Sequence, residues 1–254
     1  MSFGFEGCLL QGSLFLSKYV RLQVNDWIDF AIGKGVEDLD LAFTCDNPPK
    51  CTGWSSVDYF PAQILLNDEE SKLRRLSLRG CMLKSNFTTG FRTLSTLVLC
   101  GVNLAGHVEP HMFSSCMNFE HLTLQRCFGL ERLCIGDSLQ CLKALVVIRC
   151  EGLKGIELNA TNLTSFHYKG DEIEFSFELV PNLEEVYVMM LEINVVPTYT
   201  RLEKQLPHVK TLAVVRDWTY SYSPFNEGSG FKSVFHLASN LLFTASNCCC
   251  RCLM

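Results

Sequence analysis

The chain has 254 residues, of which 48% are hydrophobic and 19% charged, and its formal net charge is −5. This composition is typical of a globular protein and excludes disordered and collagen-like chains, and the mild charge gives no reason to expect nucleic-acid binding. No run of about 18 apolar residues occurs, so no membrane span is expected. The N-terminus lacks signal-peptide features, and we therefore expect a cytoplasmic or nuclear protein whose 14 cysteines are mostly reduced and buried.

The first predicted element is a short helix over residues 25–34, within an N-terminal cap that spans residues 1–35. One helical face collects its apolar side chains, namely Val24, Trp27, Ile28 and Ala31. Asn25 or Asp26 can cap the start of this helix, and Gly33 or Gly35 ends it. The helix is expected to cover the N-terminal end of the core.

A repeat dominates residues 36–216. Its clearest copy, LRRLSLRGC, sets Leu73, Leu76, Leu78 and Cys81 in the pattern L-x-x-L-x-L-x-x-C. The second apolar residue of successive copies falls at residues 39, 76, 97, 122, 145, 166, 186 and 212. The six steps after residue 76 average about 23 residues, within the range of leucine-rich repeats. The longer first step predicts an insertion at residues 44–56.

The repeat predicts an α/β leucine-rich-repeat solenoid, curved, with parallel strands on its concave face. In x-L-x-L-x the two leucines point inward, and stacked coils share one core. A half-period pattern, Leu130-x-x-Leu133-x-Ile135 and Leu153-x-x-Ile156-x-Leu158, predicts a convex side that is extended or irregular, with few helices. The cysteine that ends each repeat is expected to pack inside the coil. Residues 217–254 are expected to form a divergent C-terminal cap and a Cys-rich tail.

Several segments resemble plant F-box/leucine-rich-repeat proteins of the FBD type, over roughly residues 15–215. They include VRLQVNDWIDFAIGKGVEDLDLAF, YFPAQILLNDEESKLRRLSLRGCML and LKALVVIRCEGLKGIELNATNLTSFHYKG. The resemblance implies the repeat region that recognises substrates for a cullin–RING ubiquitin ligase. The family's F-box, which docks on a Skp-type adaptor, is missing from this sequence, so the adaptor contact has no module here. The alternative is a truncated relative without a ligase function of its own.

The sequence offers no catalytic constellation. His107 and His111 are separated by Pro110, which disfavours a helical zinc pair, and the cysteines at 248–252 have no second pair at zinc-site spacing. Neither a nucleotide-binding loop nor a nucleophile elbow occurs. We therefore expect no enzyme, no cofactor and no metal. A β-helix enzyme and a receptor ectodomain are disfavoured, and a small ligand on the concave face stays open.

The remaining candidate is a partner-protein surface on the concave face. Residues that flank the buried leucines point outward from the predicted strands. We expect this surface to comprise Arg75, Arg79, His121, Gln125, Val146, Ile148, His167, Lys169, Tyr187 and Met189. It is basic and polar at first and more apolar later, and exposed apolar and aromatic side chains suit protein binding.

Overall fold

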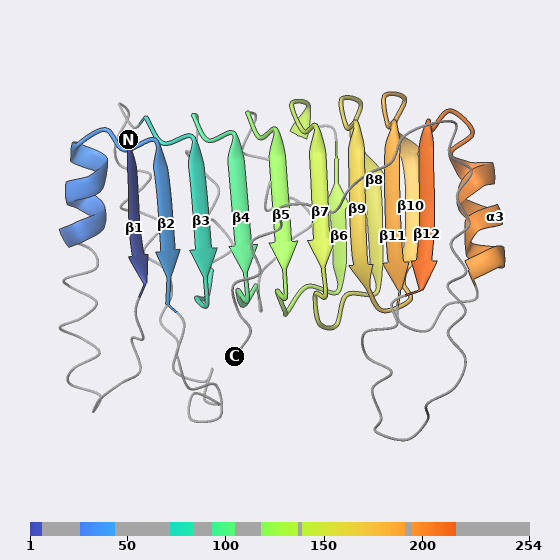
Figure 1. The fold of residues 1–254 in the computed structure, drawn as a ribbon, viewed down its shortest axis with the longest axis horizontal. Coiled ribbons are helices and arrows are strands. Elements are labelled where there is room, and N and C mark those ends of the chain that lie inside the picture. The colour runs from blue at the N-terminus through green and yellow to red at the C-terminus, as the bar shows by residue number, and fades with distance from the viewer. Residues whose placement is uncertain are drawn as a thin grey trace, which may run out of the picture.

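The computed structural model describes residues 1–6, 26–43, 72–83, 93–104, 118–136, 139–190 and 195–216. Nine parallel strands form one sheet, in the order β1-β2-β3-β4-β5-β7-β9-β11-β12 (Figure 1). The strands are Ser2–Glu6 (β1), Asp38–Ala42 (β2), Arg75–Arg79 (β3), Thr96–Cys100 (β4), His121–Gln125 (β5), Ala144–Ile148 (β7), Ser165–Gly170 (β9), Glu185–Met190 (β11) and Thr211–Arg216 (β12).

A second parallel sheet lies behind the first (Figure 1) and consists of Arg132–Ile135 (β6), Gly155–Asn159 (β8) and Glu174–Leu179 (β10). The first two are the strands that the half-period pattern predicts. Where the two sheets face each other, the core fills the space between them, because each strand there turns its apolar residues inward. The predicted solenoid of parallel strands with few helices is confirmed.

The repeat leucines stack in register from coil to coil. Leu76, Leu97, Leu122 and Leu145 pair in sequence along the sheet, and each is 0% exposed. A single coil could not cover these side chains, so the burial of every leucine depends on both of its neighbours.

Four turns that follow strands share one unusual backbone conformation. The residue directly after β3, β4, β5 and β7 has a positive φ, and these residues are Gly80 (67°), Gly101 (59°), Arg126 (50°) and Arg149 (49°). The amide of each donates a hydrogen bond to a carbonyl of the next coil, so the four positions are equivalent. Glycine adopts this conformation freely, whereas an arginine in it costs about 1–2 kcal/mol.

Cys81 and Cys127 follow such turns and are buried, as predicted. Of the other described cysteines, Cys141 is exposed and the rest are partly buried, and none of the six forms a disulfide.

A helix over residues 26–33 covers the N-terminal end of the sheet, as predicted (Figure 1). Ile28 and Ala31 enter the core. Trp27 remains 40% exposed but packs on Phe5 of β1, with ring centroids 5.1 Å apart. Gly35, with φ 68°, ends the helix and donates its amide hydrogen to Ile32.

Helix Val195–Gln205 (α3) occupies the outer side of the coil between β11 and β12. Thr198, Leu202 and Leu206 form its buried stripe, at intervals of four residues. The predicted insertion at residues 44–56 and the predicted tail at residues 217–254 lie outside the described residues. Within the described parts of the chain, no helix has both the length and the apolarity needed to cross a bilayer.

Candidate functional site: the outward face of the nine-stranded sheet

The outward face is the side of the nine-stranded sheet that points away from the core, and it carries the first, third and fifth residues of each strand. All ten residues predicted for the partner surface lie on it. Arg75, His121 and His167 are exposed, and the other seven are half-buried. In-register pairing arranges the side chains in rows, so that Val146, His167 and Tyr187 lie next to one another in the middle row.

The structure divides the predicted residues into two groups. Six of them lie on the neighbouring strands β7, β9 and β11, namely Val146, Ile148, His167, Lys169, Tyr187 and Met189. Arg75 and Arg79 lie on β3, and β4 separates them from His121 and Gln125 on β5. At a strand spacing of about 4.8 Å, Arg75 and Tyr187 are roughly 24 Å apart. One partner must be large to contact both groups.

The group on β7, β9 and β11 has a mainly apolar character. Tyr187 packs against the ring of His167, with centroids 5.8 Å apart at 52°. Although the His167 side chain is exposed overall, desolvation lowers its pKa below the usual value, and the carboxylate of Glu185 opposes this shift. A largely neutral imidazole beside Tyr187 and Val146 therefore continues the apolar surface at neutral pH.

Acidic residues on this face were missed by the prediction. Asp40, in the middle row on β2, accepts a hydrogen bond at 2.7 Å from the guanidinium of Arg79. Its other carboxylate oxygen is buried without a hydrogen-bond partner. The alternation rule would have placed Asp38 and Asp40 outward had it been applied to Val36-x-x-Leu39-x-Leu41. Arg79 is therefore a structural partner of Asp40 as well as a surface residue.

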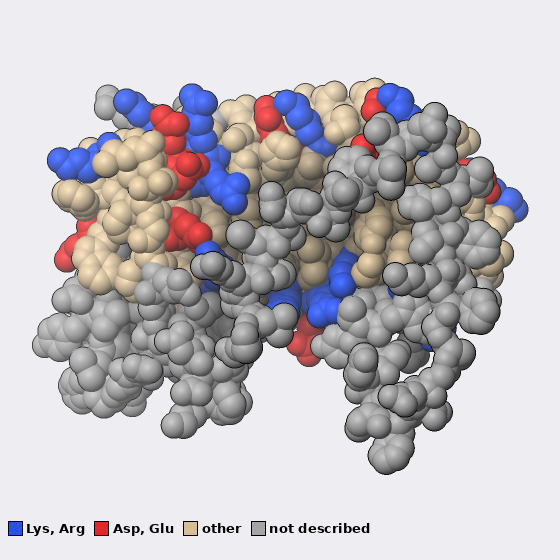
Figure 2. All heavy atoms as spheres, in the orientation of Figure 1, with Lys and Arg blue, Asp and Glu red and all other residues tan. Residues whose placement is uncertain are grey.

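Charges at the edge where the strands begin are paired between coils. Figure 2 shows Lys and Arg side chains beside Asp and Glu side chains along this upper edge, above a mostly uncharged described surface. Lys143 contacts Glu120 at 3.1 Å, and Lys210 contacts Glu184 at 2.7 Å. Such exposed pairs each contribute little stability, about 0–1 kcal/mol, but they leave this edge close to neutral.

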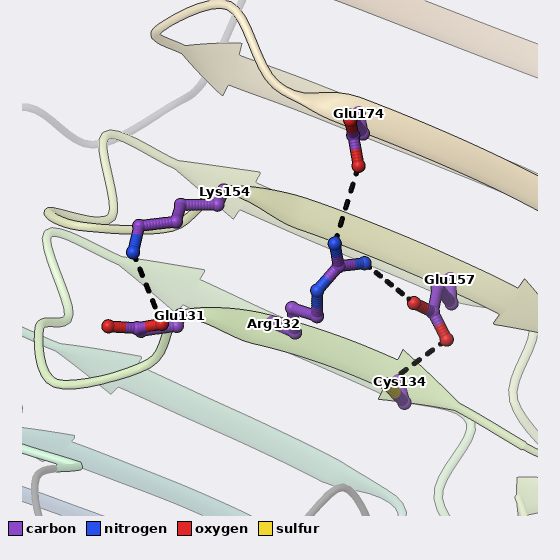
Figure 3. A network of polar contacts seen from close by, with 6 residues as sticks. All are labelled: Glu131, Arg132, Cys134, Lys154, Glu157 and Glu174. Carbon is purple, nitrogen blue, oxygen red and sulfur yellow. Dashed lines mark hydrogen bonds and ion pairs between the residues drawn. The ribbon is translucent and has the colours of Figure 1, made fainter.

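The three-stranded sheet on the opposite side carries a network of ion pairs. Arg132 on β6 bridges Glu157 on β8 at 2.9 Å and Glu174 on β10 at 3.4 Å (Figure 3). Lys154 pairs with Glu131 at 3.2 Å, and the Cys134 thiol contacts Glu157. A depression of about 430 Å³ lies between this network and Arg201 of α3. Because most of its charged side chains already pair with one another, the network fits a role in joining the strands rather than in binding a ligand.

The described residues hold no group of three or more His, Cys, Asp or Glu side chains that could bind a metal ion. His107, His111 and the cysteines at 248–252 lie outside these residues.

The comparison with protein families gives a match over most of the chain. Residues 8–227 match the leucine-rich-repeat domain of At1g61320/AtMIF1. No curated protein and no solved structure matches the chain. The match covers the whole described solenoid after β1, in agreement with the repeat, its parallel strands and its shared core. The chain therefore belongs to the family of the At1g61320/AtMIF1 leucine-rich-repeat domain.

Proposed function

We propose that this chain is a protein-interaction module that binds its partner on the outward face over β7, β9 and β11. The observation that carries the proposal is the cluster of half-buried apolar and aromatic side chains at Val146, Ile148, Tyr187 and Met189. Such clusters match the composition of interface cores, where aromatic residues and Met are enriched. The three-stranded sheet instead presents charges that are already paired.

The regular backbone supports the same proposal. Residues 144–148 of β7 pair in register with β9, and residues 165–170 of β9 pair in register with β11. A backbone fixed by hydrogen bonds on both sides presents its side chains in nearly their bound positions. Less conformational entropy is then lost on association, and more of the contact energy appears as affinity.

The resemblance to plant F-box/leucine-rich-repeat proteins supports a more specific proposal. In that reading the partner is a substrate that a ubiquitin ligase modifies, and this chain forms the substrate-recognition part of the receptor. The alternative is a truncated relative that lacks ligase function. Loss of the partner's ubiquitination in plants that lack this protein separates the two readings.

The test is an affinity purification from plant extract, read by mass spectrometry, with three forms of the full chain as bait. The wild type is compared with a Tyr187→Ala, Met189→Ala double variant and with Leu179→Ala. Leu179 is 49% exposed and lies on the three-stranded sheet, so its substitution is a matched apolar change on the opposite side. Arg75→Glu is a better charge probe than Arg79→Glu, because Arg79 also pairs with Asp40.

A partner that the double variant loses and Leu179→Ala retains supports the proposed surface. Its binding to the purified wild-type chain is then measured by calorimetric titration, and the double variant should bind at least about tenfold more weakly. Equal binding by the double variant, or a loss with Leu179→Ala, contradicts the assignment to the outward face. Recovery of chaperones alone favours the truncated, inactive alternative.

A further inference from the structure

Two cysteines occupy equivalent places in neighbouring coils. Cys127 and Cys150 each follow an arginine with positive φ, at the ends of β5 and β7. The Cys127 sulfur lies 3.4 Å from the carbonyl oxygen of Leu99, and the Cys150 sulfur lies 3.7 Å from that of Leu124. Leu99 and Leu124 are partners in the sheet. The two cysteines are therefore offset by one strand spacing, about 4.8 Å, which lies within the Cα separations that a disulfide spans.

The two cysteines are neighbours in adjacent coils but differ in their exposure to solvent. The two positions are joined through the backbone, because the amide of Glu151, directly after Cys150, donates a hydrogen bond at 2.9 Å to the carbonyl oxygen of Cys127. Cys127 is 0% exposed, whereas Cys150 is only partly buried. A small reagent dissolved in water should therefore reach Cys150 more readily than Cys127.

This proximity also makes the two thiols chemically unequal. The neighbouring Cys127 side chain lowers the pKa of Cys150, burial opposes this shift, and the Cys127 backbone lowers the pKa further. The Cys150 side chain and burial raise the pKa of Cys127. The thiolate is the nucleophilic form of cysteine. The less buried cysteine is thus also the one that more readily becomes a nucleophile.

We propose that Cys127 and Cys150 form a peroxide-responsive dithiol, in which Cys150 is oxidised first and Cys127 then closes a reversible disulfide between two coils. The oxidant is hydrogen peroxide or another small hydroperoxide. The proposal is independent of partner binding on the outward face.

The chemistry balances in two steps. The Cys150 thiolate attacks one peroxide oxygen, the O–O bond breaks, and hydroxide leaves while Cys150 becomes a sulfenic acid. The Cys127 sulfur then attacks the Cys150 sulfur, and the hydroxyl leaves with the Cys127 proton as water. Overall, two thiols are oxidised, one peroxide is reduced and two waters form.

Cys81 provides an internal comparison. Cys81 occupies the equivalent position after β3, two coils before Cys127. The same position in the coil between them, after β4, holds Val102 instead of a cysteine. Burial raises the pKa of Cys81 to about 12. Cys81 should therefore stay reduced under conditions that join Cys127 to Cys150. Val102 also shows that the fold accepts valine at this position, which makes Cys127→Val a conservative substitution.

The experiment uses the full chain, reduced, desalted and exposed to hydrogen peroxide, after which remaining thiols are blocked with N-ethylmaleimide and the protein is digested with trypsin. Cleavage after Arg126, Arg132, Arg149 and Lys154 separates the two thiols into the peptides CFGLER and CEGLK. We expect these peptides to be recovered as one disulfide-linked species, which reduction with dithiothreitol separates into the two peptides. Oxidation should also raise the urea midpoint of unfolding, and reduction should restore it.

Variants test the order of the steps. In Cys127→Val, Cys150 should accumulate as a sulfenic acid that dimedone labels, whereas in Cys150→Val, Cys127 should remain unlabelled. Cys81→Val should leave the linked peptides unchanged. The proposal is overturned if the wild type yields no linked peptide while exposed Cys141 is oxidised, or if Cys127 is labelled as readily as Cys150. The wild-type measurement decides the matter even if a variant fails to fold.

Discussion

Gly170, the last residue of β9, leaves no room for a side chain. A Cβ atom placed on it would lie 2.7 Å from the Tyr168 hydroxyl oxygen and 3.1 Å from Tyr168 Cζ. Tyr168 is 3% exposed, and its hydroxyl donates a hydrogen bond to the carbonyl of Asp171 at 2.7 Å. The Gly170→Ala substitution must therefore displace a buried ring that is held at its far end.

The magnitude follows from two costs. Forcing a methyl group into this packed site costs about 1–3 kcal/mol. Displacing the hydroxyl from Asp171 leaves a buried polar group unpaired, at about 1–3 kcal/mol. The lower backbone entropy of alanine in the unfolded chain returns about 0.4–1 kcal/mol. We expect Gly170→Ala to lower the free energy of unfolding by about 2–4 kcal/mol.

The assay is urea denaturation followed by far-UV circular dichroism, with Tyr168→Phe and the double variant measured in parallel. Tyr168→Phe removes the oxygen at 2.7 Å and should cost about 1 kcal/mol by itself. Because the clash with the hydroxyl is then gone, the double variant should be about 1–2 kcal/mol more stable than the sum of the single effects. Gly33→Ala is the control, since a Cβ there meets nothing within 4 Å. Strict additivity, or a Gly170→Ala effect below about 0.5 kcal/mol, would refute the steric reasoning.

Three further predictions concern the core, the turns and the outward face. Leu97→Asp places a charge at a site that is 0% exposed and should abolish cooperative thermal unfolding. Leu97→Ala should lower the free energy of unfolding by about 2–5 kcal/mol. An unchanged melting temperature for Leu97→Asp contradicts the repeat register. Arg126→Gly and Arg149→Gly each remove the steric strain of a side chain at a positive φ. Each should raise the free energy of unfolding by about 1 kcal/mol, measured by urea titration. The control Arg126→Lys should leave it unchanged. Because the pKa of His167 is lowered in the folded chain, the unfolded chain binds the proton first as pH falls below about 6.5. Stability should therefore decrease as pH falls from about 6.5 toward the folded pKa and level off below it. His167→Asn should flatten this dependence, and equal slopes for the two proteins would exclude His167 as its source.

The sequence predicted the repeating part of the fold because burial there depends on spacing alone. Strands β3, β4, β5 and β7 follow the same alternation at a nearly constant interval. Two outer strands follow it at the half period. Strand β10 was missed because the first apolar position of the half-period pattern, Leu130 and Leu153 in the earlier copies, is Glu172 here. The second apolar position, Phe175, is buried as the pattern requires.

The ends of the solenoid were harder to predict. Phe3 and Phe5 follow the alternation of a strand in β1, but their distance along the chain from Leu39 and Leu41 is longer than the repeat interval. The strand forms through its pairing with β2. Helix α3 was missed because Pro197 and several β-branched residues weaken its helical signal, although proline is tolerated in a first turn. The spacing of Thr198, Leu202 and Leu206 would have revealed it.

The candidate surface was predictable as a set of outward positions, and the contacts within it were not. Alternation places Tyr187 and His167 on one face, but only the register between β9 and β11 makes them neighbours. The proximity of Cys127 and Cys150 likewise requires the coil geometry. The positive φ of Arg126 and Arg149 was missed because glycine is the residue expected in that conformation.

The outer strands β6, β8 and β10 also determine how the solenoid can bend. A coil bends the array when its outer element is wider than the inner strand, and a helix, at about 10 Å, is twice as wide as the spacing between strands. Where strands pair on both sides of the core, from β5 to β9, the spacing between neighbouring coils is the same on the outer and the inner side. Equal spacing on both sides gives the sheet no reason to curve there. In the described chain, α3 is the only wider outer element between β5 and β12. A partner of the central coils would therefore meet a nearly level surface, suited to a flat or extended binding segment rather than a rounded domain.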